Sequence, residues 1–165
     1  MQKQSAQSGQ TADRLQLVSF TVGEELFAVD ILSVQEINRM MALTKVPQSP
    51  DGIEGVINLR GRIIPVLDLR VQFRINPSEL NESSRIIVVE VQGNTIGFIV
   101  DSVQQVILID RNIIEPTPQM TTSIDSSYVD GVAKLEDDLL ILVNLDNLLS
   151  PEALSKLSGM NKAAA

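Results

Sequence analysis

One stretch of this chain occurs twice in related form, and this repeat restricts the fold more than any other feature. Residues 55–69 (GVINLRGRIIPVLDL) align without a gap with residues 131–145 (GVAKLEDDLLILVNL), at a shift of 131 − 55 = 76 residues. Both blocks begin with glycine and keep aliphatic residues at matched positions. Self-similarity at a fixed spacing indicates two copies of one supersecondary unit.

A second match, which needs small gaps, lies upstream of each block. It sets Val29-Asp30 against Val100-Asp101, and residues 33–37 (SVQEI) against residues 102–106 (SVQQV). Chance similarity between strands rich in valine and isoleucine is the alternative explanation. Because the two matches keep the same order, we favour a duplicated unit that carries a hairpin, a turn and a second hairpin.

The apolar pattern is typical of β-structure, and helix is scarce. Residues 15–22 and 26–31 predict a hairpin across a turn at residues 23–25. A short helix is expected at 69–73, and a longer one from Ser150 to near Gly159. Many short strands separated by turns indicate closed or partly closed barrels. The remaining strands are expected at 34–38, 43–46, 55–60, 62–68, 85–92, 95–101, 103–109, 129–135 and 139–145.

These patterns divide the chain into a domain and two tails. The polar residues 1–13 predict a disordered N-terminal tail, and residues 151–165 a C-terminal helix with a frayed end. Between them lies one domain, residues 15–150. Its first half is expected at about 15–83 and its second at about 84–150, with strands that can be exchanged between them.

Composition removes several classes of function. The chain has no cysteine and no histidine, so it lacks thiolate ligands and the commonest general base. Its net charge of −8 makes nucleic acid and anionic membranes poor partners. No apolar run reaches the roughly 18 residues of a membrane span, and the polar start shows no secretory signal. We therefore expect a cytoplasmic protein.

The carboxylates are the remaining candidates for chemistry. Paired carboxylates can bind a hard cation or act as acid and base. However, Asp30, Asp68 and Asp101 each end an apolar strand, where aspartate commonly caps a turn. The cluster at residues 136–138 is expected at a solvated hairpin tip. We predict no catalytic residue, no cofactor and no metal site.

The two halves differ in charge at one pair of positions. The first half has Glu36 and Arg60, where the second has Gln105 and Glu136. Glu36 and Arg60 can form an ion pair if their strands lie side by side, and such a pair could fix the shape of a binding groove. The alternative is a solvated surface pair that contributes less than ~1 kcal/mol.

Five segments together resemble the CheW family of bacterial chemotaxis coupling proteins, from about Leu17 to Leu149. Any one of them alone would be a moderate signal, but their order and character agree along nearly the whole chain. The segments are residues 27–37 (FAVDILSVQEI), 50–61 (PDGIEGVINLRG), 64–70 (IPVLDLR), 97–103 (GFIVDSV) and 139–145 (LLILVNL).

The resemblance implies a fold and a set of partners. Family members consist of two five-stranded SH3-like β-barrel halves and have no enzymatic activity or cofactor. They join the cytoplasmic tip of chemoreceptors to the regulatory domain of the kinase CheA, in arrays at the membrane that can include further CheW copies. Because no receiver domain follows the barrels, the chain resembles the stand-alone coupler and not the longer CheV form.

The resemblance also implies site residues. Glu36 and Arg60 match the paired residues of the receptor-facing groove, to which Asn58 also belongs. Ile31 and Val34 match apolar receptor contacts. Gly55 matches a position that tolerates little bulk, and Gly55 and Gly61 are expected to support the groove. Kinase contacts are not assigned.

Three other functions stay open from the sequence. They are a CheW-like coupler of a pathway other than chemotaxis, a small-ligand-binding barrel, and a carboxylate-based hydrolase. The co-purifying kinase would identify the first, a ligand retained through purification the second, and activity lost on mutation of a close aspartate pair the third.

Overall fold

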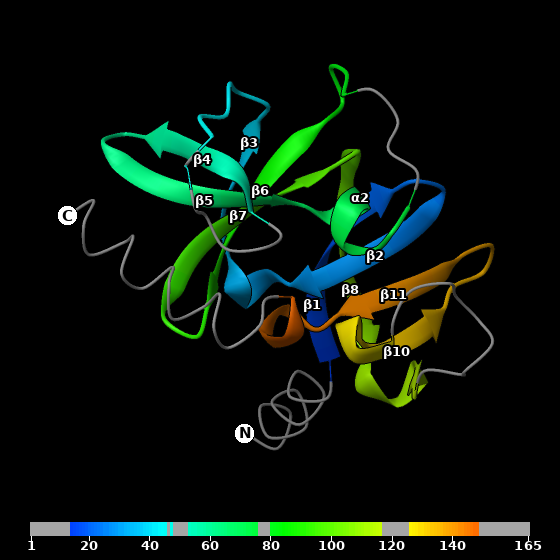
Figure 1. Cartoon of the computed structure of the whole chain (residues 1–165). Coiled ribbons are helices and arrows are strands. Elements are labelled where there is room, and N and C mark those ends of the chain that lie inside the picture. Colours follow the sequence, from blue (N-terminus) through cyan, green and yellow to red (C-terminus); the bar gives the residue numbers. More distant parts are fainter. Residues whose placement is uncertain (1–13, 46, 48–52, 76–79, 117–125, 149–165) are drawn as a thin grey trace.

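The computed structural model describes residues 14–45, 47, 53–75, 80–116 and 126–148. Within these ranges the chain forms two β-sheets and very little helix, which confirms the prediction of a mainly β fold (Figure 1). The strands are β1 (Arg14–Val22), β2 (Glu25–Asp30), β3 (Val34–Arg39), β4 (Ile53–Leu59), β5 (Arg62–Asp68), β6 (Arg85–Val91), β7 (Asn94–Val100), β8 (Ser102–Asp110), β9 (Ile114–Glu115), β10 (Val129–Lys134) and β11 (Leu139–Val143).

Each sheet combines strands from both halves of the sequence. The six-stranded sheet has the order β8-β1-β2-β11-β10-β9, and the five-stranded sheet has the order β3-β6-β7-β5-β4. In the first sheet the hairpin β1–β2 joins β10–β11 through a parallel pairing of β2 with β11. In the second, the hairpin β6–β7 joins β4–β5 through a parallel pairing of β5 with β7. The two sheets therefore repeat one topology.

The strand registers preserve the 76-residue shift of the first repeat block. Ile53 pairs with Leu67 and Gly55 with Val66, while Val129 pairs with Val143 and Gly131 with Leu142. The ladder shifts at the same place in both hairpins, between the first and third residue of these strands. A bulge retained at an equivalent position indicates that the two hairpins are copies of one unit.

The upstream match holds only in part. Val34 pairs with Val89 and Glu36 with Val88, and the second half repeats this bulge where Val103 pairs with Phe20 and Gln105 with Ser19. Residues 33–37 and 102–106 are therefore equivalent, at a shift of 69.

The pairing of Asp30 with Asp101 in that match is wrong. The hairpin ends Val22–Glu25 and Val91–Asn94 set the same shift of 69, which places Asp30 level with Ile99. The physical reason is that hairpin pairing determines strand register, whereas an aspartate can end a strand at several positions.

Other local expectations differ in outcome. The strand predicted at 43–46 is wrong: Thr44 forms an isolated bridge with Val56, and strand β3 has already ended at Arg39. The two-residue strand β9 was not predicted, and it gives one sheet six strands where five were expected. The short helix predicted at 69–73 is present as α2 (Leu69–Gln72). The helix predicted from Ser150 lies outside the described residues.

The main core lies between the two sheets and contains all four phenylalanines of the chain. Phe20 and Phe27 come from one sheet, Phe98 from the other, and Phe73 follows α2. The ring centroids of Phe20 lie 6.0 Å from Phe27 and 5.7 Å from Phe98. Two aliphatic clusters fill the rest of the sheets, one around Ile57 and one around Leu140. Phenylalanine contacts therefore lie among the aliphatic residues that join the two sheets.

Candidate functional site

The turn between β4 and β5 presents Arg60 at the tip of a tight hairpin. Arg60 and Gly61 both have positive φ, 52° and 86°, as a two-residue type I′ turn requires. Asn58 stabilises the turn because its side-chain Oδ1 accepts a hydrogen bond from the Gly61 amide at 2.9 Å. A Cβ on Gly61 would meet no atom within 4 Å, so glycine is needed here for its backbone conformation and not for space.

Arg60 forms an ion pair with Glu36 on β3, and Asn38 contacts the same carboxylate. The guanidinium donates to Glu36 Oε2, while the Asn38 amide donates to Oε1 at 2.9 Å. The Arg60 hydrogen bond, followed by that of Asn38, lowers the pKa of Glu36 below its usual value. The Arg60 side chain is 70% exposed and that of Glu36 29% exposed, so the pair lies at the surface and its guanidinium is accessible to a partner.

The strands that carry this pair are not hydrogen-bonded neighbours. β3 and β4 are the two edge strands of the five-stranded sheet, separated by β6, β7 and β5. The ion pair therefore connects the two edge strands of the sheet, although no backbone ladder joins β3 to β4. Met40, Met41 and Leu43 pack on the aliphatic cluster of this sheet, between the two edges.

Gly55 permits this closure. A Cβ at Gly55 would lie 2.8 Å from the backbone oxygen of Thr44 and 3.3 Å from Leu43 Cβ. Thr44 and Val56 exchange two backbone hydrogen bonds, of 2.9 and 2.8 Å, beside it. Any side chain at position 55 would push this segment away from β4.

The turn between β2 and β3 separates apolar residues onto opposite sides. It is the 3-10 helix η1 (Ile31–Ser33), and Asp30 caps it by accepting a hydrogen bond from the Leu32 amide at 2.9 Å. Ile31 and Val34 are partly buried against the main core, whereas Leu32 is 90% exposed. Sequence reasoning missed Leu32. Asp30 was the available signal for this exposure. An aspartate after a strand can cap a helical turn, and such a turn changes which of the following residues points outward.

The structure thus divides the sequence-predicted site into two groups. Glu36, Asn58, Arg60 and Gly61 are linked by hydrogen bonds at the ends of β3 and β4. Ile31 begins η1, Val34 follows it, and both contact the main core. Both groups meet on β3, which begins at Val34 and carries Glu36 two residues later.

The aspartates that end strands have structural partners. Asp68 accepts from the Arg70 backbone amide at 2.9 Å and so caps α2. Asp101 accepts from the Gly23 amide at 2.6 Å, in the β1–β2 turn, and does not cap its own turn. No group of three or more acidic residues is placed to hold a metal ion in the described part of the chain. Within the same residues, no helix is long and apolar enough to cross a membrane.

Comparison with known proteins identifies the fold. The CheW-like domain family matches residues 16–153, which is most of the chain. The chain belongs to the CheW family. It is 35% identical to the chemotaxis protein CheW of Klebsiella aerogenes over 94% of this chain and 93% of that protein. It is also 33% identical to CheW of Thermotoga maritima, over 81% and 87% respectively.

A solved structure supports the same assignment. The scaffolding protein TtCheW of Thermoanaerobacter tengcongensis superposes with a TM-score of 0.77 and 44% identity, covering 84% of this chain and 90% of that one. The chain is therefore a chemotaxis coupling adaptor. The small-ligand barrel and the coupler of another pathway are not favoured by these relatives.

Proposed function

We propose that this CheW-family adaptor binds the cytoplasmic tip of chemoreceptors through one surface and the regulatory domain of the kinase CheA through another. It acts in the cytoplasm at membrane-associated receptor arrays, without chemistry or a cofactor of its own. The single observation that carries the receptor part is the exposed Arg60, held by Glu36, whose carboxylate also accepts a hydrogen bond from Asn38.

The receptor surface combines an apolar contact with a fixed charge pair. Leu32 supplies the exposed apolar side chain, and Ile31 and Val34 anchor the turn by packing against the main core. Helix-in-groove recognition uses apolar anchors of this kind, with polar groups that set orientation. Arg60 and Glu36 fill that second role, because a paired guanidinium keeps free N–H donors for a carboxylate or carbonyl on the receptor.

The remaining predicted residues hold this surface in place. Asn58 and Gly61 determine the turn that carries Arg60, and Gly55 lets residues 43 and 44 pack against β4. These three residues therefore act through position and not through contact with the receptor.

The kinase surface is proposed at the outer side of β8. This edge strand exposes Val106 (51%) and Leu108 (57%), and Ile113 of the following turn is 40% exposed. Exposed apolar side chains on an edge strand suit a protein partner with a complementary β-fold. The regulatory domain of CheA, which itself resembles CheW, is such a partner. A change in receptor conformation would then shift the activity of the kinase only through contacts that differ between the receptor's states.

The test is calorimetric titration of the full chain with a receptor tip fragment and, separately, with the CheA regulatory domain. Arg60→Glu places two carboxylates together and should weaken receptor binding by roughly tenfold or more, leaving kinase binding unchanged. Arg14→Glu, which breaks the exposed pair with Asp110, is the matched control. Equal receptor affinity of folded Arg60→Glu and the parent would contradict the proposed receptor surface.

A further inference from the structure

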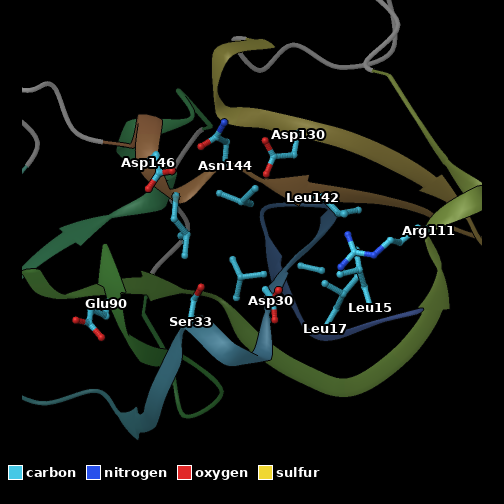
Figure 2. Close-up of a pocket in the computed structure, with 14 residues that line it drawn as sticks. Leu15, Leu17, Asp30, Ser33, Glu90, Arg111, Asp130, Leu142, Asn144 and Asp146 are labelled. Atoms are coloured by element: carbon cyan, nitrogen blue, oxygen red, sulfur yellow. The ribbon is translucent and has the colours of Figure 1, made fainter. Parts of the chain in front are cut away.

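A pocket of about 300 Å³ lies between the β10–β11 hairpin and the β1–β2 hairpin, next to η1. Figure 2 shows Asp130, Asn144 and Asp146 along one side, with Asp30 and Ser33 facing them. Leucine side chains, including Leu15, Leu17 and Leu142, form an apolar part of the wall. The remaining charged lining residues are Glu90 and Arg111.

The equivalent place in the other half of the chain is already filled. The 76-residue shift makes Glu54, Asp68 and Arg70 the counterparts of Asp130, Asn144 and Asp146, and the matching strand registers support this equivalence. There the Arg70 guanidinium is buried, with Nε 3.0 Å from one oxygen of Asp68 and Nη2 2.7 Å from the other. The charge of Glu54 also favours the guanidinium.

The second half keeps an acidic residue, Asp130, at the place of Glu54, but it has the neutral Asn144 where the first half has Asp68, and it lacks an internal cation. Aspartate stands at position 146, where the first half has Arg70, so a negative charge replaces a positive one. Partial burial and the nearby charge of Asp146 raise the pKa of Asp130, although a hydrogen bond from Asn144 opposes the rise. Four carboxylates therefore line the pocket against one guanidinium, that of Arg111, which already has interactions of its own.

We propose that this pocket binds the arginine side chain of a partner protein, which occupies the place that Arg70 fills in the other half. A guanidinium can pair with two carboxylates in fixed geometry, and its aliphatic stem can lie on the leucine wall. A metal ion fits poorly, since no group of acidic residues in the described part of the chain is arranged to ligate one.

The pocket is placed for contact with another protein. Asp30 and Ser33 of its lining belong to the turn that carries the 90% exposed Leu32. A partner that covers Leu32 can therefore reach the pocket with a neighbouring arginine. The inference concerns the pocket itself and does not depend on which of the adaptor's partners supplies the arginine.

Amide chemical shifts of the ¹⁵N-labelled full chain, titrated with N-acetyl-arginine amide, test the proposal. We expect saturable millimolar binding, with the largest shifts at Asp30 and at residues 144–146. N-acetyl-citrulline amide, which has the same shape without the charge, should give at most small unsaturated shifts. Equal shifts from both compounds, or no saturable shift from the arginine compound, would overturn the proposal.

A substitution that fills the pocket from within provides the second test. Asp146→Arg places a guanidinium at the position of Arg70 and replaces the like-charged neighbour of Asp130 by an opposite charge, so we expect it to abolish arginine-amide binding and to raise Tm by roughly 2–4 °C. Asp137→Arg at the exposed β10–β11 turn makes the same charge change and should alter neither property. If Asp146→Arg fails to fold, Asp130→Asn provides the binding test. Retained affinity in a folded Asp146→Arg or Asp130→Asn variant would place the binding elsewhere and refute the assignment.

Discussion

At the scale of single residues, the site depends on the polar side chains of Glu36, Asn38 and Arg60, which differ in how far the sequence predicts their role. Glu36 and Arg60 could be found because they break the charge symmetry of the repeat. Asn38, whose amide donates to the Glu36 carboxylate, was missed, although its place two residues after Glu36 in the predicted strand was an available signal. The two residues are two positions apart on β3 and so share a face of the strand. Leu32 was missed for a different reason. Its side chain is exposed because the helical turn η1 points it away from the core, and that turn was not predicted.

The ion pair predicts a measurable titration. Because the Glu36 pKa is lowered in the folded state, the pair stabilises the fold above the ordinary carboxyl value of 4.5. That contribution is lost as the pH falls through the lowered pKa. Arg60→Gln should raise the Glu36 pKa toward 4.5, as followed by carboxyl-carbon NMR. Arg14→Gln should leave the Glu36 pKa unchanged, and an unaltered Glu36 pKa in Arg60→Gln would show that Arg60 is not the cause.

At the scale of elements, each duplicated hairpin ends in a short helical turn, but the two turns are anchored differently. α2 follows β5 and is held by the buried pair of Asp68 and Arg70, whose side chains are only 9% and 6% exposed. η4 (Leu145–Asn147) follows β11 and has no such internal pair, because its aspartate stands in place of the arginine. In the first half the Arg70 guanidinium thus fills this position, whereas the second half has Asp146 there and no internal cation.

Removal of one partner of the buried pair should be costly. Arg70→Met leaves the Asp68 carboxylate uncompensated, and we expect a loss of about 3–5 kcal/mol in the free energy of unfolding, measured with urea. The double variant Asp68→Asn, Arg70→Met should lose less, because no buried charge remains. The exposed Arg14→Met should change stability by less than ~1 kcal/mol. A similar small loss in Arg70→Met would mean that the pair is not needed.

The strands were predicted well where the alternation of apolar and polar residues agrees with the position of turn residues. They were predicted poorly at short segments on the sheet edges. The gap between the strands predicted at 85–92 and 95–101 is a turn in which Gln92 and Gly93 both have positive φ. The segment at 43–46 carries the right residues for a strand, yet its single bridge at Thr44 depends on close approach to Gly55. The equivalent approach at Gly131 accommodates the two-residue strand β9. Such pairings depend on backbone proximity, which residue patterns do not encode.

At the scale of the whole molecule, duplication in the sequence does not correspond to one sheet for each half. The repeat predicted two related units, but the hydrophobic pattern gives the face of a strand and not its partner. In the structure β11 adds to the β1–β2 hairpin, and β5 adds to the β6–β7 hairpin. Neither half contains a complete sheet.

Division of the chain between Ser83 and Ser84 tests this interdependence. We expect fragments 1–83 and 84–165 to lack dispersed amide spectra when alone, because each leaves the strands of two sheets unpaired. Mixing them should restore the spectrum of the intact chain, since the junction lies in the connection between α2 and β6. A dispersed spectrum from either fragment alone would show that a half folds without strands from the other.

The parallel pairing of β2 with β11 has a consequence for synthesis on the ribosome. Asp30 and Leu139 are 139 − 30 = 109 residues apart, so translation at ~5–20 residues per second takes roughly 5–20 s to cover the interval. During that time the β2 edge of the nascent β1–β2 hairpin stays open, and the β1 edge is also open until β8 has been made. An open apolar edge can pair with other chains, so a polysome carrying many copies of this hairpin concentrates the risk of aggregation. Emergence of β11 therefore completes the sheet and covers the edge of β2.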